Sequence, residues 1–242
     1  AKALQRQIEH AEELLQQAWL RNGQTRLAEQ LLGQPGLEQL GHSALAFLTS
    51  YLDAPVAAFY VREDDGGLKR VAAHGFTPIS AQVERTFYDA QGLIGHAAAQ
   101  NQVIQLDDVP PDYLQITSGL GQASPRHVLV VPLHHDGQVT GVVEMAFLRP
   151  LVKRDLELAA IMANNIGTAL HGAVNRQRLQ DAVREGHCGL LPEKMLPGMV
   201  RVQIARDISL AQTAAESHRP GMVVLLVAGN GHVQRSLGVP LH

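Results

Sequence analysis

The sequence predicts an α+β protein in which an antiparallel sheet is flanked by helices, with long helices at both ends of the sheet region. Two observations carry this prediction. Apolar residues recur three and four positions apart over residues 4–18 and again over residues 156–173, which is typical of helices that bury one stripe of side chains. Between these segments, Val-rich runs flank short Gly-containing turns, which is typical of β-hairpins.

The first helix is expected over residues 1–34. Apolar residues alternate at spacings of four and three in its first half, at Leu4, Ile8, Ala11, Leu15 and Ala18. This a/d spacing buries one stripe of a helix against a partner helix. It extends over about two to three heptads, which leaves open a parallel homodimer, the interpretation we favour, and packing on the chain's own domain. Asn22-Gly23 weakens the pattern, and the turn-forming residues 33–36 end it.

The middle of the chain is expected to form the sheet, because Val-rich and Leu-rich runs are typical of half-buried or central strands. Short turns rich in Asp and Gly connect such runs as hairpins. The expected elements, in chain order, are a helix over residues 37–51, a hairpin over 56–75 turning at Asp64–Gly67, a short helix over 92–101, a brief strand and proline-containing loop over 102–113, and a hairpin over 127–148 turning at His135–Gly137.

A second long helix is expected to leave the sheet after Arg149-Pro150 and to run to about Val183. Its apolar residues again step by three and four, at Leu156, Ala159, Ala163, Ile166, Leu170 and Ala173. We therefore assign one dimer seam to both long helices, formed by Leu4, Ile8, Leu15, Ile166 and Leu170. Helices that enter and leave a sheet in this way are suited to transmit a displacement.

The remaining segment, residues 184–242, is expected to contain a proline-punctuated helix and a strand at Val223–Val227, followed by Gly229-Asn230-Gly231-His232. A Gly-rich turn after a strand suggests a dinucleotide site, but Gln234 stands where the third glycine of that motif belongs. The two glycines are instead expected to let the chain turn tightly and present His232. The 57 residues from Gly186 to His242, with one helix and one strand, cannot readily bury a core alone.

Composition excludes several classes of function. The formal net charge of −3 provides no basic surface for nucleic acid. The single cysteine, Cys188, excludes intramolecular disulfides and a thiolate zinc cluster, and it is typical of a reducing compartment. No apolar run approaches the ~18 residues of a membrane span. We therefore expect a cytoplasmic chain without a membrane span.

Three segments resemble a known family: "SALAFLTSYLDAPVAAFYVRED", the stretch from "GLIGHAAAQN" to "GVVEMAF", and "DLELAAIMANNIGTAL". Over residues 20–180 the chain resembles the GAF domain of bacterial hybrid sensor histidine kinases. The resemblance implies a PAS-like antiparallel sheet of about five or six strands over residues 35–183, with helices on one face. It also implies a small-molecule pocket on the other face, beneath the 110–125 loop, and a histidine kinase core of a two-component system in a parent protein.

The resemblance points to a set of candidate pocket residues, Phe59, Tyr113, Ile116, Ser118, His127 and Glu144. A buried histidine in such a domain can ligate haem through a neutral imidazole. His74, His96 and His127 are the candidates, although hydrogen-bonded or exposed histidines are the favoured interpretation. We expect His134 and His135 in water at the hairpin turn, and Asp107-Asp108 as turn residues that bond to the backbone.

Sequence motifs that would mark a sharper function are missing from the GAF-like region. The Asn-Lys-x-x-Asp-Glu motif of cyclic-nucleotide-binding GAF domains does not occur. No cysteine is available to tether a bilin or to act as the nucleophile of a free methionine sulfoxide reductase, because Cys188 lies outside this region. The sequence therefore predicts a sensory module and not an enzyme.

The tail has a resemblance of its own. Over residues 186–240, "HCGLLPEKMLPGMVRVQIARD" and "LLVAGNGHVQRSLGVP" resemble the C-terminal part of ChaN-like haem-binding lipoproteins. The most specific points are His187, Arg206-Asp207 and the Gly229–His232 motif. The resemblance implies an alternative function, in which His232 binds haem or a metal with His187 or Met199 as partner.

Overall fold

The computed structural model describes residues 2–33, 36–75, 86–111, 113–118, 121–234 and 238–241. It divides into two compact units, Ala1–Ala173 and Val174–His242. The boundary falls inside one long helix, α5 (Lys153–Gly186), which continues from the first unit into the second. Among the described residues, none of the helices has the length and apolar character needed to span a bilayer.

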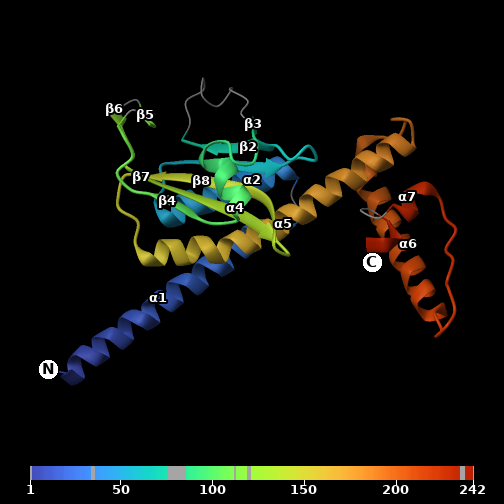
Figure 1. Ribbon diagram of the computed structural model, residues 1–242, viewed down its shortest axis with the longest axis horizontal. Helices are drawn as coiled ribbons and strands as arrows, with labels where there is room; N and C mark the ends of the chain where they lie inside the picture. Colours follow the sequence, from blue (N-terminus) through green and yellow to red (C-terminus); the bar gives the residue numbers. More distant parts are fainter. Residues whose placement is uncertain are drawn as a thin grey trace. The chain divides into compact units, whose positions relative to one another are not determined.

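Within the described residues, the first unit contains a main sheet of six antiparallel strands in the order β3-β2-β1-β8-β7-β4 (Figure 1). The predicted α+β class and strand number are therefore confirmed. The strands are β1 (Val56–Arg62), β2 (Leu68–His74), β3 (Thr86–Phe87), β4 (Ile104–Leu106), β7 (His127–His135) and β8 (Gln138–Phe147). A separate pair is formed by β5 (Ile116–Ser118) and β6 (Gly121–Ala123).

Both predicted hairpins are present. Strand β1 pairs with β2, and β7 pairs with β8 over almost their full lengths. The second turn consists of Asp136 and Gly137, whose φ angles are 48° and 77°. Positive φ at both central residues is the geometry of a type I′ turn, which matches the twist of the flanking strands.

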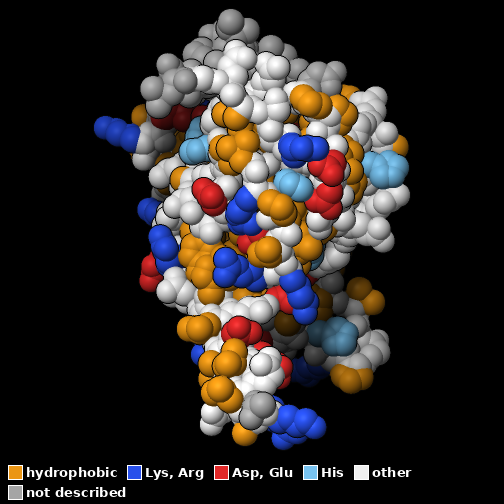
Figure 2. All heavy atoms as spheres, turned by 90° about the vertical axis from the view of Figure 1, so that its left-hand side faces the viewer, with side chains coloured by type: hydrophobic (Ala, Val, Ile, Leu, Met, Phe, Trp, Pro, Cys, Tyr) orange, Lys and Arg blue, Asp and Glu red, His pale blue; other side chains and the backbone are white. Residues whose placement is uncertain are grey.

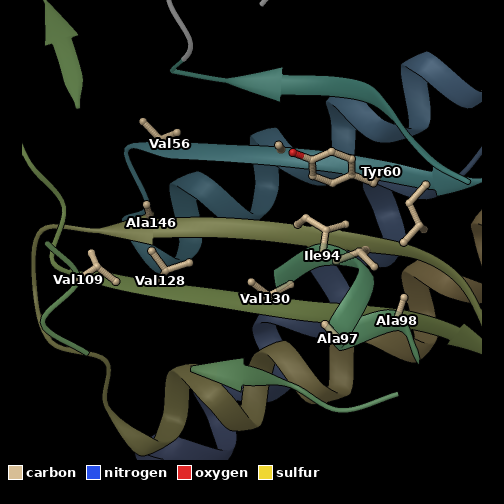
Figure 3. Packing of buried hydrophobic residues seen from close by; sticks show 12 residues of the cluster. Val56, Tyr60, Ile94, Ala97, Ala98, Val109, Val128, Val130 and Ala146 are labelled. Carbon is tan, nitrogen blue, oxygen red and sulfur yellow. The ribbon is translucent and has the colours of Figure 1, made fainter. Parts of the chain in front are cut away.

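Helices cover the two faces of the sheet differently. On one face lie α2 (Leu37–Leu52), which contacts β1 and β2, and the first part of α5, which packs on β7 and β8. The other face carries the short helix α4 (Gly92–Gln100), which packs with Ile94, Ala97 and Ala98 against strand residues such as Val130 (Figure 3). The uncovered remainder of this second face is available for a cavity.

The N-terminal helix α1 (Lys2–Leu31) runs without interruption through Asn22-Gly23, where the sequence pattern weakens. Gly23 is buried, and a Cβ added there would lie 3.0 Å from side-chain carbons of both Leu158 and Tyr51. The glycine therefore permits a close crossing of α1 with α2 and α5. Tyr51 also donates a hydrogen bond of 2.8 Å to the carbonyl oxygen of Trp19, and the two rings lie 4.9 Å apart.

The first half of α1 makes few such contacts. Leu4, Ile8 and Leu15 are 62%, 45% and 71% exposed. Figure 2 shows hydrophobic side chains on the protruding end at the bottom of the view, where this helix begins. The apolar stripe that the sequence predicts therefore has no partner within the described part of the first unit.

The other two residues of the predicted seam have a different role. Ile166 is 1% exposed and Leu170 is fully buried. Ile166 packs with Leu133 and Val143 of the sheet, and the methyl group of Leu170 lies close to Gly141 of β8. The three-and-four spacing of α5 was thus interpreted wrongly as a dimer seam, because this stripe covers the sheet of its own chain.

A partly buried ion pair joins the end of β8 to the start of α5. Arg149 donates to the Asp155 carboxylate at 2.6 Å and to the carbonyl oxygen of Leu52 at 2.7 Å. Asp155 is 1% exposed and also accepts a hydrogen bond from the backbone N–H of Val152. The pair therefore connects the ends of α2 and β8 to the first turn of α5.

The second unit is mainly helical. The end of α5 packs on α6 (Leu196–Ser217) through a small cluster of Leu179 and Val200, with Val183 and Ile204 at its edge. Three short helices also belong to this unit: η1 (Glu193–Met195), α7 (Asn230–Val233) and η2 (Val239–Leu241).

The strand predicted at Val223–Val227 does not form. Residues 222–229 have no regular secondary structure, and Val223, Leu225 and Val227 are 93%, 84% and 86% exposed. Gly229 and Gly231 do not adopt positive φ, and the chain turns through the short helix α7 instead. An apolar run forms a strand only when a neighbouring strand is present to pair with it.

Candidate functional site

A cavity of about 480 Å³ lies on the α4 face of the sheet. Its floor is apolar and comes from three neighbouring strands, through Val56 and Ala58 of β1, Ala146 of β8 and Val128 of β7 (Figure 3). Leu93 and Ile94 of α4 close one side, and residues 113–115 of the following loop close another. The volume is typical of sites for small molecules.

The strand register decides which side chains reach this cavity. Val56 pairs with Ala146 and Ala58 pairs with Glu144, so these residues share one face of the sheet. Because side chains alternate along a strand, Phe59 must point to the opposite face. There its Cδ1 would lie 3.5 Å from a Cβ added at Gly41 of α2, and the side chain is fully buried. The assignment of Phe59 to the pocket was therefore wrong.

Five polar side chains line the otherwise apolar cavity: Tyr60 of β1, Arg70 of β2, Glu144 of β8, and Tyr113 and Gln115 of the loop. Arg70 and Glu144 are half-buried and also take part in interactions within the chain. Burial raises the pKa of the Tyr113 hydroxyl, and the nearby Glu144 carboxylate raises it further. The phenol is therefore a neutral hydrogen-bond donor at physiological pH.

Sequence reasoning missed Arg70, because a bulge changes the direction of its side chain. In the pairing of β1 with β2, Phe59 lies opposite Ala72 but Tyr60 lies opposite Arg70. The extra residue, Val71, shifts the alternation so that Arg70 joins Tyr60 on the cavity face. The alternation of Leu68 and Arg70 at the start of β2 was the available signal, since Leu68 also packs on this face.

The remaining predicted pocket residues lie elsewhere. Ile116 packs at the edge of the hydrophobic core, and Ser118 belongs to β5, with its side chain outside the described part of the chain. His127 neighbours Val128 on β7 and so points away from the cavity; its Nδ1 lies 2.8 Å from the Asp107 carboxylate. Of the six candidates, Tyr113 and Glu144 therefore line the cavity.

Among the described residues that line the cavity there is no histidine. His74 is exposed at the end of β2, and His96 is exposed on α4 with its Nε2 3.0 Å from the amide of Gln100. The three histidines considered as haem ligands in this region, His74, His96 and His127, are therefore exposed or hydrogen-bonded, which is the interpretation that the sequence favoured.

The prediction for Asp107 and Asp108 needs correction. Among the described residues, the side chains of Asp107 and Asp108 do not bond to the backbone as expected. Asp107 contacts His127 and Gln105, and Asp108 pairs with Arg126 at 2.7 Å. The hydrogen bond from His127 lowers the pKa of Asp107, and the one from Gln105 lowers it further.

His134 and His135 do not lie in water at the turn, because both belong to the end of β7 and are half-buried. His135 stacks on His171 of α5 with the ring centroids 4.4 Å apart. The rings therefore fill the space between the hairpin and the helix.

In the second unit, His232 is held by a buried carboxylate. Its Nδ1 lies 2.5 Å from Oδ1 of Asp207, and the side chain of Gln203 lies 3.0 Å from the same nitrogen. Asp207 is fully buried, and its other oxygen has no hydrogen-bond partner among the described residues. With its Nδ1 proton directed to the carboxylate, the imidazole leaves Nε2 as an acceptor or ligand atom.

The other histidine of the predicted tail site lies apart from this arrangement. His187 is exposed and its Nδ1 donates to the carbonyl oxygen of Val183 at 2.7 Å, while Met199 is half-buried on α6. In the part of the chain that the structure covers, no three His, Cys, Asp or Glu side chains are grouped as metal ligands. The contact of Asp207 with His232, which the sequence did not predict, is the main feature of this unit.

Comparison with solved structures supports the fold of the first unit. The GAF domain of a phosphoenolpyruvate-protein phosphotransferase from Coxiella burnetii has a TM-score of 0.53 and 20% identity, over 67% of this chain and 96% of that one. The GAF domain of the Acinetobacter phosphoenolpyruvate-protein phosphotransferase has a TM-score of 0.52 and 15% identity, over 66% of this chain and 94% of that one. The A. aeolicus nlh2 GAF domain in an inactive state has a TM-score of 0.50 and 18% identity, over 64% of this chain and 96% of that one. At these identities the similarity establishes the fold alone.

Other comparisons are less informative. Free methionine-R-sulfoxide reductases also match, with TM-scores of 0.49 or lower, which is too low to support an inference. The absence of enzymatic activity stays a prediction. A search of curated proteins finds no match. A family model described as "Haem-binding uptake, Tiki superfamily, ChaN" matches residues 138–242, which is less than half of the chain.

The GAF domain model matches residues 34–171, which contain every strand of the main sheet, both helices α2 and α4, and the first part of α5. This match covers more than half of the sequence and coincides with the unit that contains the cavity. The chain therefore belongs to the GAF domain family.

Proposed function

We propose that this chain is a non-catalytic sensory module that relays the occupancy of its cavity to the long helix α5. The observation that carries this proposal is the alternation along β8. Glu144 and Ala146 line the cavity, whereas Val143 and Met145 between and beside them pack against α5 through residues such as Ile166. A ligand and the helix therefore contact opposite sides of one strand.

The close packing between strand and helix makes this relay physically reasonable. Interiors are packed as densely as organic crystals, so a shift of β8 must be accommodated by Met162 and Ile166 of α5. A ligand moves such an equilibrium only by the difference in its affinity for the two states. The proposal therefore requires two packing arrangements of α5 on the sheet, of which the ligand favours one.

The relay is tested without knowing the ligand by filling the cavity. Ala146→Met places a larger side chain into the cavity from its floor and should imitate occupancy. We expect altered hydrogen–deuterium exchange in residues 158–170 of α5, relative to Ala123→Met on the exposed strand β6. Unchanged exchange in α5 in a folded Ala146→Met protein would contradict the relay.

We further propose that α1 forms a parallel homodimer and that the module serves a histidine kinase core in a two-component system. Support comes from the a/d spacing and exposure of Leu4, Ile8 and Leu15. A paired stripe would bury apolar surface that the single chain leaves in water, and α5 could then deliver a change to a further helical element.

The dimer is tested by the double change Ile8→Asp and Leu15→Asp. Two buried charges on each helix would oppose association, so we expect a monomer at micromolar concentration by sedimentation velocity. His10→Asp, on the outer face of the same helix, is the matched control and should remain dimeric. A dimer that survives the double change sinks this part of the proposal.

A second candidate function is haem binding by the tail, and the contact of Asp207 with His232 is the observation that favours it. A carboxylate that accepts the Nδ1 proton orients an imidazole and strengthens Nε2 as an axial ligand. The haem-binding family match over residues 138–242 gives weaker support. Haem bound in this way would make the chain a haem carrier or sensor.

Haem titration of the full chain tests this alternative. A saturable Soret band that is lost in His232→Ala and shifted in Asp207→Asn is the expected result. His218→Ala changes an exposed histidine of the same unit and should bind as the parent does. Equal binding by the parent and His232→Ala would assign the haem to another site and exclude this one.

A further inference from the structure

The cavity of the first unit contains one group of each charge. Among its described lining residues, Glu144 is the only acid and Arg70 is the only base. The other described contacts are mainly aliphatic or aromatic, with Tyr60, Phe87 and Tyr113 as the aromatic side chains. A cavity of this kind favours a ligand that is apolar over most of its surface and charged at one end.

The register brings the two charges to opposite sides of the same strand. Arg70 lies beside Tyr60 and Glu144 lies beside Ala58, with β1 between them. Strand spacing and rise separate their backbones by roughly 10 Å across the sheet and roughly 7 Å along it. Both side chains are long enough to lean over β1, so a small head group above Ala58 and Tyr60 can meet both.

Electrostatics makes this pair selective. A charged ligand group leaves water only at a cost, which an oppositely charged hydrogen-bonding partner offsets. Both residues already interact within the chain. A carboxylate offers several acceptor positions and a guanidinium offers five donors, so groups of these kinds can hold a ligand in addition to a partner in the chain. An ammonium group is favoured at Glu144 and a carboxylate at Arg70.

We infer that the cavity binds a zwitterion with an apolar body, which is the chemistry of a free apolar α-amino acid. The ammonium group pairs with Glu144 and the carboxylate with Arg70. The apolar side chain lies on the floor formed by Val56, Ala58 and Ala146. This assignment rests on the proposed sensory function and names the class of ligand to which it responds.

Calorimetric titration of the full chain with matched probes tests the assignment. L-Phenylalanine is compared with 2-phenylethylamine, which lacks the carboxylate, and with 3-phenylpropanoate, which lacks the amine. L-Leucine and its two corresponding analogues form a second series. We expect one amino acid to bind at least about tenfold more tightly than either of its analogues, because each loses one charge-assisted hydrogen-bonded contact.

Two substitutions assign the charges. In Glu144→Gln the amine should no longer contribute, so the deaminated analogue should bind about as well as the amino acid. In Arg70→Gln the decarboxylated analogue should do so instead. A merely structural effect would weaken all three probes alike and would not exchange their order. Glu63→Gln, an exposed acid outside the cavity, should leave the order unchanged.

The outcomes separate this inference from the proposed function. Equal binding of an amino acid and its singly charged analogues, or no binding in either series, overturns the zwitterion assignment. A preference that neither Glu144→Gln nor Arg70→Gln alters overturns it as well. The relay itself is judged by α5 exchange in Ala146→Met, which requires no ligand, so it stands or falls independently.

Discussion

The two units of the chain cover their apolar residues in different ways. In the first unit, the Val-rich strand β8 lies between two paired strands, and Val142 and Val143 are 0% and 1% exposed. In the second unit, the equally apolar run at Val223–Val227 has no partner strand among the described residues, and Val223 is 93% exposed. Apolar sequence alone is therefore not sufficient to form a strand.

The difference follows from what a strand requires. Its backbone N–H and C=O groups must be paired when they are buried, and its side chains need a second layer to cover them. The first unit supplies both through hairpins that are local in sequence and helices on each face. The described residues of the second unit supply a small cluster around Leu179 and Val200, which is too small to bury the apolar run.

The largest expected effect is a difference in stability between core substitutions in the two units. Ile166→Ala removes a buried side chain from the layer between α5 and the sheet and should lower the free energy of unfolding by about 2–5 kcal/mol. Leu225→Ala removes an exposed side chain and should change it by less than about 0.5 kcal/mol. Chemical denaturation followed by circular dichroism measures both.

This pair of variants also separates the two interpretations of α5. If Ile166 lined a dimer seam, its replacement by alanine would shift the monomer–dimer equilibrium and leave the unfolding of the monomer nearly unchanged. A large loss of stability with unchanged association would agree with the buried position. Similar losses for Ile166→Ala and Leu225→Ala would remove the contrast between the units.

Local sequence patterns predicted most of the first unit. The turns predicted at Asp64–Gly67 and His135–Gly137 identify both hairpins because such turns bring adjacent segments together without help from the rest of the chain. The long helix α5 follows from its apolar spacing. These features depend on residues close in sequence, which is why one sequence is enough to find them.

The candidate site was predicted less well, because its geometry depends on pairing between distant segments. Phe59 was placed in the pocket although the register of β1 turns it toward α2, and Arg70 was missed because of the bulge beside it. Likewise, the apolar spacing of α5 does not distinguish a helix that packs on a sheet from a helix that packs on a second helix. Only the contacts of Ile166 and Leu170 decide that question.

The ion pair at the start of α5 gives the second prediction. Arg149→Met would leave the buried Asp155 carboxylate without its cation and should cost about 3 kcal/mol of stability. The double variant Arg149→Met, Asp155→Leu removes both charges and should recover much of that loss. If the double variant is as unstable as Arg149→Met, the cost comes from lost packing of the arginine and not from the unpaired carboxylate.

A third, more local effect is expected in limited proteolysis. Thermolysin cleaves beside apolar residues in segments that open easily, and local opening requires little free energy where few contacts are broken. The first cut should fall within residues 222–228, before any cut in the equally apolar β1, β7 or β8. Mass spectrometry of the early fragments identifies the site. A first cut inside the sheet would reverse the proposed order of local stability.

The smallest effect concerns the exposed contact of Asp107 with His127, which lies at the edge of the stable unit. The hydrogen bond lowers the pKa of Asp107 below its ordinary value near 3.8. A carboxyl group with a lowered pKa stabilises the folded state above its unfolded pKa and loses that contribution as the pH falls through its folded pKa. The change is therefore confined to pH values near and below 4, and exposure keeps it small.

Carbon-detected NMR titration should show the Asp107 pKa rising toward its ordinary value in His127→Leu but not in His96→Leu. An unchanged pKa in His127→Leu would mean that Gln105 alone holds the carboxylate, and that β7 is not linked to the end of β4 through this pair.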